Sequence, residues 1–263
     1  SPCRVFLIFC CFFILVIHAQ GAFCAPGYSS NAYGMLGLNI VPSARMEEAG
    51  TIRGQLSVTD PYLHGFLGVQ ITDSLFIGMR QSIEVSSLND EAKRLYPGID
   101  GKIRLFSENR IRPEIALGVQ SGMGHKRQAG EYIAASKRYK DFDFTGGLGW
   151  GRFAGGGLFS NPFKALGTHF DKDRALEGEE SNMPGDWFTG KDVGAFAGIE
   201  YFTAIDGLSL KADIGSDAYK AEQAAFDFDR PAPWSFGANY NIANILNFGV
   251  AAQGFERVMV RLS

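Results

Sequence analysis

The chain has little cysteine beyond its first residues, little proline and almost no net charge. Of its four cysteines, Cys3, Cys10 and Cys11 lie in one N-terminal apolar segment, and Cys24 is the only other. A disulfide framework and a thiolate metal site are therefore excluded for the rest of the chain. Ten prolines and no collagen period argue against a disordered or fibrous protein. The net charge of −3 is too small for a nucleic-acid-binding arm.

No apolar run is long enough to cross a bilayer as a helix. Residues 5–17 read VFLIFCCFFILVI, which is 13 residues, whereas a spanning helix needs about 20. The run fits the apolar region of a secretory signal peptide, and small residues from Ala19 to Ala22 follow it. We predict a signal peptide over residues 1–22, with an uncleaved anchor as the alternative. Phe23 argues against lipid attachment at Cys24.

Glycine and phenylalanine are abundant, with 33 and 22 residues, and the dominant pattern is alternation. In residues 62–71, for example, Leu63, Leu67 and Val69 share one face while His64 and Gln70 share the other. Turn residues separate the alternating segments. Twelve such segments follow residue 49: 50–58, 62–71, 74–82, 101–106, 112–120, 130–139, 142–150, 192–202, 207–214, 233–242, 245–253 and 256–262.

Short and long connections alternate along the chain. The predicted long ones are 84–98, 121–129, 152–191 and 215–232, and most of the others have two to five residues. This asymmetry is typical of outer-membrane barrels, which have short periplasmic turns and longer outer loops. The sequence therefore predicts an all-β fold, an antiparallel up-and-down transmembrane β-barrel of about twelve strands over residues 50–263, preceded by a periplasmic lead-in over 23–49.

A soluble β-sandwich or lipocalin-like barrel has the same period, but its apolar face packs inward. Glycine and charges of both signs on the polar face favour the membrane barrel. Leu67, Leu117 and Phe248 distinguish the two, because they face lipid in one fold and a dry core in the other. Aromatic residues at strand ends suit the interfacial girdles of a membrane barrel: Tyr62, Trp150, Tyr201, Trp234 and Tyr240.

The polar face predicts a wet interior. Its candidates for contact with a polymer are Arg53, Tyr62, His64, Arg80, Lys102, Arg104, Glu114, Asp143, Glu200, Lys211 and Asp213; Arg261 also points inward. Basic groups beside Tyr62, Phe66 and Phe196 suit an anionic sugar chain. The alternative is a charge network that plugs the barrel. A twelve-stranded barrel is intermediate between small barrels, whose side chains fill the lumen, and large barrels, which hold an open channel.

No motif indicates catalysis, a cofactor or a metal. A Walker loop, a His-Glu-x-x-His pair and Gly-x-Ser-x-Gly are all missing. Residues 151–157 are glycine-rich but suit the base of a loop, and His64 suits a polar lumen residue better than a general base. The loop 160–191 is a surface loop, an inward-folded plug or a contact for a partner or polymer. We expect no enzymatic activity.

Two stretches carry a family resemblance. They are residues 37–51 (GLNIVPSARMEEAGT) and residues 131–152 (EYIAASKRYKDFDFTGGLGWGR). They resemble the YjbH-like family of outer-membrane β-barrel proteins, which are encoded with exopolysaccharide or capsule secretion genes. The similarity extends over roughly residues 34–262. The resemblance implies a bacterial outer-membrane location and a non-enzymatic role in exopolysaccharide or capsule biosynthesis and export.

The resemblance also implies partners and leaves alternatives. Expected partners are outer-membrane lipid, an anionic polysaccharide and other secretion proteins, and not nucleic acid. Arg45 either pairs locally with Glu47 and Glu48 or docks another secretion subunit. Family members are usually longer, with more domains after the first barrel, so the resemblance leads us to expect a short paralogue or a truncated product. The rival functions are a barrel hydrolase acting on lipid or glycan and a general porin.

Overall fold

The computed structural model describes residues 27–88, 94–155, 157–174, 176, 180–225, 228–243 and 245–263. The predicted signal peptide and Cys24 lie outside these residues. Among the described residues, no helix is both long enough and apolar enough to cross a membrane.

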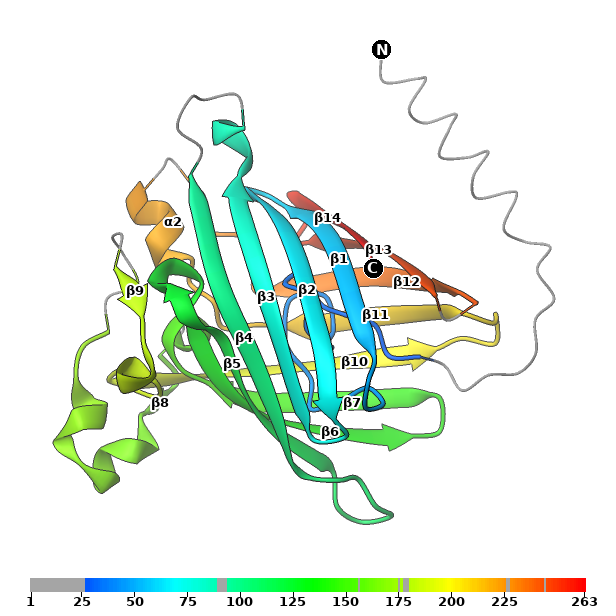
Figure 1. The fold of residues 1–263 in the computed structure, drawn as a ribbon, viewed down its shortest axis with the longest axis horizontal. Coiled ribbons are helices and arrows are strands. Elements are labelled where there is room, and N and C mark those ends of the chain that lie inside the picture. Colours follow the sequence, from blue (N-terminus) through cyan, green and yellow to red (C-terminus); the bar gives the residue numbers. More distant parts are fainter. Residues whose placement is uncertain are drawn as a thin grey trace.

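Twelve long strands form one closed antiparallel sheet (Figure 1). Each strand pairs with its neighbours in chain order, and the pairings β10 with β11 and β14 with β1 complete the ring. The strands are β1 (Ile52–Thr59), β2 (Tyr62–Thr72), β3 (Leu75–Glu84), β4 (Leu95–Phe106), β5 (Glu114–His125), β6 (Gly130–Tyr139), β7 (Phe142–Gly149), β10 (Asp192–Phe202), β11 (Leu208–Ile214), β12 (Trp234–Ile242), β13 (Leu246–Gln253) and β14 (Arg257–Leu262). The predicted fold class and all twelve predicted strands are confirmed.

The two ends of the barrel differ as the loop lengths predict. The short-turn end carries the connections 73–74, 107–113, 140–141, 203–207 and 243–245. The long-loop end carries 60–61, 85–94, 126–129, 150–191, 215–233 and 254–256. The remaining elements all lie at the long-loop end: η2 (Val85–Ser87), η3 (Lys126–Gln128), η4 (Gly151–Ala154), β8 (Phe159–Ser160), η5 (Pro162–Leu166), η6 (Thr168–Asp171), β9 (Ser181–Asn182), η7 (Pro184–Asp186) and α2 (Lys220–Ala225).

The apolar face of the strands points outward. Leu67 is 52% exposed, and Leu117 and Phe248 are half-buried on the same outward side. Across β1 and β2, exposed Leu56, Leu67 and Val69 alternate with buried Gln55, His64 and Gln70. This arrangement matches a membrane barrel and overturns the soluble alternatives, whose apolar face lies inside.

Two strands extend further than the sequence predicts. β4 begins at Leu95 rather than residue 101, and β5 continues to His125. The sequence did not predict the start of β4, because Pro97 and Gly98 lie there and both residue types are rare inside strands. Pro97 is tolerated here on the outward face opposite Gln81, and the register between β4 and β5 shifts nearby, between Ile99 and Gly101.

Three of the five aromatic residues predicted for the girdle face outward. Tyr201, Trp234 and Tyr240 lie on the outward face and are partly exposed. Tyr62 instead points into the lumen, where its hydroxyl donates to Glu222 at 3.0 Å. Trp150 follows the end of β7 and is buried, and its indole nitrogen donates to Asn161 at 2.9 Å. Tyr62 shares the inward face of β2 with His64, as alternation predicts, so only its placement in the girdle was wrong. Trp150 is buried because the long loop beyond β7 covers that strand end.

Replacing Leu67 with arginine is expected to lower the free energy of unfolding by about 2–4 kcal/mol, because a cation then faces hydrocarbon near the middle of the barrel wall. The measurement is urea unfolding of the purified barrel in lipid bilayers. The matched control is Ile111→Arg, since Ile111 is 90% exposed in the turn between β4 and β5. Equal effects at the two positions would show that the outward face does not meet lipid.

Candidate functional site

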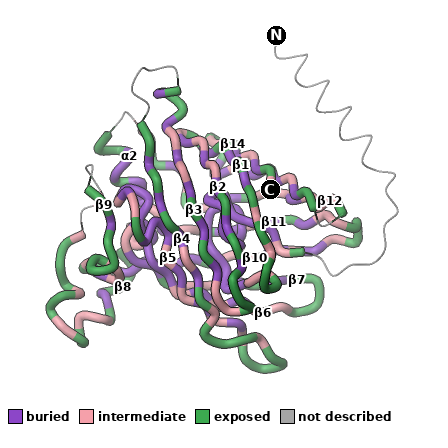
Figure 2. The backbone as a smooth tube through the Cα atoms, in the orientation of Figure 1, coloured by how far each residue is buried: buried purple, intermediate pink, exposed green. Residues whose placement is uncertain are grey.

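The barrel lumen contains a segment of the chain itself. Residues 28–46, which we call the plug, lie inside the wall, and every residue from Ser29 to Arg45 is buried (Figures 1 and 2). The sequence suggested a periplasmic lead-in for this stretch, so its position inside the barrel corrects that interpretation. The physical reason is that the side chains of a twelve-stranded wall do not fill the interior, whereas an inserted segment does.

The plug enters and leaves the barrel at the short-turn end. The Tyr28 ring contacts Phe202, the last residue of β10, with ring centroids 6.1 Å apart. At the other end of the plug, Ala49 donates to Asp73 in the turn between β2 and β3. Gly34 lies at the tip of the plug, against Phe66 in the middle of β2. Residues 28–46 therefore form a re-entrant loop, with bridges from Ser30 to Leu36 and from Gly37 to Pro42.

Replacing Gly34 with alanine is expected to destabilise the protein by about 1–3 kcal/mol more than replacing Gly50. Both glycines have a positive φ, +105° and +88°, so both substitutions carry backbone strain. A Cβ on Gly34 lies 2.2 Å from Cγ of Phe66, whereas a Cβ on Gly50 has no atom within 4 Å. Urea unfolding of the two variants isolates the contact with Phe66, and equal losses would contradict the position of the plug tip.

Asp213 of β11 binds the main chain of the plug. One carboxylate oxygen accepts the backbone N–H groups of Asn39, Ile40 and Val41 at 2.8, 2.8 and 3.2 Å. The other oxygen accepts the hydroxyl of Ser235 on β12. A carboxylate that accepts several amide hydrogens is a strong, charge-assisted anchor. This contact recognises backbone and not side chains.

Three cations on the wall bind carbonyl groups of the plug. Lys102 of β4 donates to the carbonyls of Leu36, Ser43 and Arg45 at 3.3, 3.2 and 2.8 Å. Lys211 of β11 donates to Gly37, and Arg261 of β14 donates to Leu38 at 3.0 Å. These ammonium and guanidinium groups are buried, so the carbonyl oxygens replace the water that they would otherwise bind.

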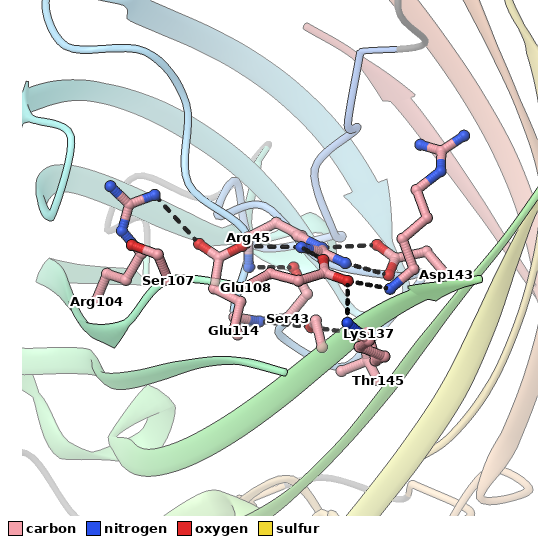
Figure 3. Close-up of polar contacts among 12 residues, drawn as sticks. Ser43, Arg45, Arg104, Ser107, Glu108, Glu114, Lys137, Asp143 and Thr145 are labelled. Atoms are coloured by element: carbon pink, nitrogen blue, oxygen red, sulfur yellow. Dashed lines mark hydrogen bonds and ion pairs between the residues drawn. The ribbon is translucent and has the colours of Figure 1, made fainter. Parts of the chain in front are cut away.

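Arg45 joins the plug to the wall by ion pairs at the short-turn end (Figure 3). Its guanidinium binds both oxygens of Asp143 at 2.6 and 2.9 Å, and it reaches Glu114 at 2.9 Å and Glu108 at 2.6 Å. Partial burial would raise the pKa of Glu108, but hydrogen bonds from Lys137 and Arg45 outweigh it and lower that pKa. The predicted pairing of Arg45 with Glu47 and Glu48 is wrong, because Glu47 instead pairs with Arg53.

The plug also supplies the apolar centre of the barrel. Met35, Leu38, Ile40 and Val41 are buried, together with Ala32 and Ala44. They form one cluster with lumen-facing aromatic residues of the wall, namely Phe66, Phe76, Tyr132 and Phe196. An internal cavity beside Tyr28, Arg45 and Glu200 has a volume of about 10 Å³, which holds one water molecule at most.

Above the plug tip, the long loops close the other half of the lumen. Arg152 of η4 pairs with Asp217 at 2.5 Å and with Glu222 of α2 at 2.8 Å. Its guanidinium also lies 5.9 Å from the ring centre of Tyr33 in the plug. Burial raises the pKa of Asp217 to about 6, against the opposing effect of Arg152. The outer loops and the plug therefore meet through one charged cluster.

The described part of the loop 160–191 is folded and lies outside the lumen. Asn161 donates to the carbonyls of Phe170, Phe188 and Gly190 at 3.1, 2.9 and 2.9 Å. Rings of Trp150 and Phe163 stack 5.2 Å apart at the centre of this loop. The loop is also attached to the barrel, because β8 pairs with β10 and β9 pairs with β5. The inward-folded plug is therefore residues 28–46, not this loop.

All eleven predicted polymer-contact residues point inward, but the plug and its own network occupy the lumen. Lys102, Lys211, Asp213 and Glu114 bind the plug directly. Glu200 accepts from Ser29, Asp143 binds Arg45, Arg53 binds Glu47, and Arg104 binds Glu114 at 3.5 Å. Tyr62, His64 and Arg80 lie beyond the plug tip, where Arg80 pairs with Asp100 at 3.1 Å and His64 contacts Ser82 at 2.7 Å. In the structure, these side chains form the charge network that fills the barrel, which was the alternative to an open channel.

Sequence reasoning missed the residues that complete the site. They are the plug itself and the loop residues Arg152, Asp217 and Glu222, all of which lie outside alternating segments. One signal was present: residues 28–46 contain seven serine, asparagine or glycine residues but a single charge, Arg45. A lead-in exposed to water would carry more charge than that.

Comparison with known proteins shows the family. The family model described as "Exopolysaccharide biosynthesis protein YbjH" matches residues 29–263, so it includes the plug and the whole barrel. The chain belongs to this family. The expected family resemblance is thereby confirmed. Since the match begins at the plug, the plug and the wall are parts of one family unit.

Two individual proteins are also similar. The chain is 27% identical over 226 residues to the "Uncharacterized lipoprotein YjbH" of Escherichia coli K12, a match that covers 83% of this chain. The chain spans 32% of the length of that relative. Among solved structures, a mutant porin of Rh. blastica aligns with a TM-score of 0.30 at 10% identity, over 77% of this chain and 54% of the porin.

Proposed function

We propose that this protein is a non-enzymatic outer-membrane component of exopolysaccharide or capsule biosynthesis and export. The observation that carries the proposal is the family match over residues 29–263 of a chain that folds as a closed barrel with an apolar outward face. An apolar outer face on a closed barrel suits the outer membrane. Its partners are then outer-membrane lipid, the anionic polymer and other secretion proteins.

The filled lumen favours this role over a general porin. A porin keeps an aqueous channel through its barrel, whereas here residues 29–45 are buried inside the wall. The wall side chains predicted to meet a polymer are engaged with the plug, as Lys102, Lys211 and Asp213 show. The surfaces offered to partners in this closed state are the long loops and the short turns.

The test is deletion of the gene in a bacterium that carries it, with polymer measured in the medium and in the cell envelope. We expect secreted polymer to fall and wild-type protein to restore it. Membrane fractionation and heat-modifiable migration on a gel test the location and the folded barrel in the same strains. Unchanged polymer in both fractions would overturn the proposal. Release of products from purified glycan or lipid by the purified protein would favour the hydrolase.

A further inference from the structure

We propose that the plug withdraws as a unit through the short-turn end, that the long-loop cluster of Arg152, Asp217 and Glu222 separates once it loses its contact with Tyr33 of the plug, and that the lumen then conducts small ions. The inference rests on the proposed membrane location and goes beyond the proposed role in export. Three independent features of the structure support it: the wall closes without the plug, the path of the plug is not threaded, and the wall carries the polar surface of a channel.

The wall does not depend on the plug for its hydrogen bonds. Every barrel strand pairs with two other barrel strands, and the ring is complete from β1 to β14. The plug adds no strand to this sheet; its bridges, Ser30 to Leu36 and Gly37 to Pro42, are internal. Removal of residues 28–46 from the lumen therefore leaves all strand pairs intact and opens no sheet edge.

The route out of the barrel is also clear. Both ends of the plug lie at the short-turn end, beside Phe202 and beside Asp73. The tip at Gly34 reaches only the middle of β2. A loop that enters and leaves by the same opening can slide out without cutting or unfolding the barrel. A segment passing through both ends could not.

Apart from the apolar belt of Phe66, Phe76 and Phe196, the inward face of the wall is suited to water once the plug has left. Its buried inward positions include Gln55, Ser57, Lys102, Glu200 and Lys211, which water can solvate. Beyond the plug tip, several buried atoms have no hydrogen-bond partner among the described residues: Nε2 of His64, Nε and Nη1 of Arg80, Oδ2 of Asp100 and Oε1 of Gln120. Leaving such atoms unpaired is costly, and hydration of the lumen would remove that cost.

A disulfide lock tests the inference directly. A Cβ on Gly215 lies 3.4 Å from Cγ1 of Val41, so cysteines at these positions come within bonding reach. Val41→Cys/Gly215→Cys, in a Cys24→Ser background, ties the plug to the wall just beyond β11. The purified full chain is placed in planar bilayers in potassium chloride. We expect openings in the reduced protein, silence after oxidation and recovery of openings with dithiothreitol.

A second variant tests the same point without a crosslink. Asp213→Asn removes the charge that holds three plug amides, and we expect the open fraction to rise about tenfold or more. Asp206→Asn, in the exposed turn between β10 and β11, is the control and leaves the open fraction unchanged. Heat-modifiable migration on a gel shows that each barrel is folded.

Two results would overturn the proposal. One is equal conductance of the oxidised and reduced double-cysteine protein. The other is silence of both the reduced protein and folded Asp213→Asn. The proposed role in export is judged separately from polymer levels in the deletion strain. Conductance with normal polymer secretion would refute the role in export alone, and a silent barrel with lost secretion would refute the gate alone.

Discussion

The Arg45→Met variant is expected to lose about 3–5 kcal/mol of unfolding free energy, the typical cost of removing one partner from a buried ion pair. Arg45 is the guanidinium that faces Asp143, Glu114 and Glu108 at once. Asp143 and Glu114 are buried on the lumen side of β7 and β5. Without Arg45, Asp143 loses its guanidinium partner, and Glu114 keeps a longer contact of 3.5 Å with Arg104.

Urea unfolding in lipid bilayers measures this loss. The control is Arg110→Met, which removes the same group from an exposed position in the turn between β4 and β5, where an effect within about 0.5 kcal/mol is expected. Adding Asp143→Asn to Arg45→Met should recover part of the stability, since it removes the carboxylate charge that has lost its guanidinium partner. A loss as small as that of Arg110→Met would contradict the buried ion cluster.

Replacement of Asp213 by alanine is expected to cost about 3–5 kcal/mol, because three buried amides lose their acceptor and each unpaired group costs about 1–3 kcal/mol. The amides belong to Asn39, Ile40 and Val41, so the loss falls on the plug. Lys211, on the same strand, still binds the plug in this variant. We therefore expect the plug to be held less firmly than in the wild type.

Trypsin provides a local readout for this variant. Arg45 is the single lysine or arginine within residues 28–46, and it is buried in the intact barrel. Cleavage after Arg45 should be slow in the wild type and faster in Asp213→Ala. Asp206→Ala, in an exposed turn, should be cut at the wild-type rate. Equal cleavage of all three proteins would show that Asp213 does not retain the plug.

Alternation predicted the wall because every strand has one face in water or protein and one in an apolar medium. Leu67 and His64 show this rule within a single strand, and no long-range contact is needed to assign their faces. The rule failed where tertiary structure covers a strand end. Trp150 and Val193 continue outward-facing rows, yet the loop at β8 buries both.

The occupant of the lumen was not predictable in the same way. Residues 28–46 have no strand or helix period, because their backbone groups bind wall side chains, as with Asp213 and Lys102, or one another in short irregular turns. Those partners are 57 to 174 residues away in sequence. Alternation showed that Lys102 and Asp213 point inward, but it carried no information about what they meet there. The predicted roles of the eleven inward residues in polymer contact stay predictions.

Side chains of the wall bind the plug largely through its backbone amide and carbonyl groups, which do not depend on the identity of the plug residue. Substitutions at Asn39, Ile40 or Val41 therefore leave those bonds in place, provided that the new side chain fits the space. Other plug positions are constrained by identity, because Gly34 lies against Phe66 and Arg45 lies among its carboxylates. Ile40 and Val41 also pack in the apolar cluster, so a new side chain there alters the packing while the amide bonds to Asp213 persist.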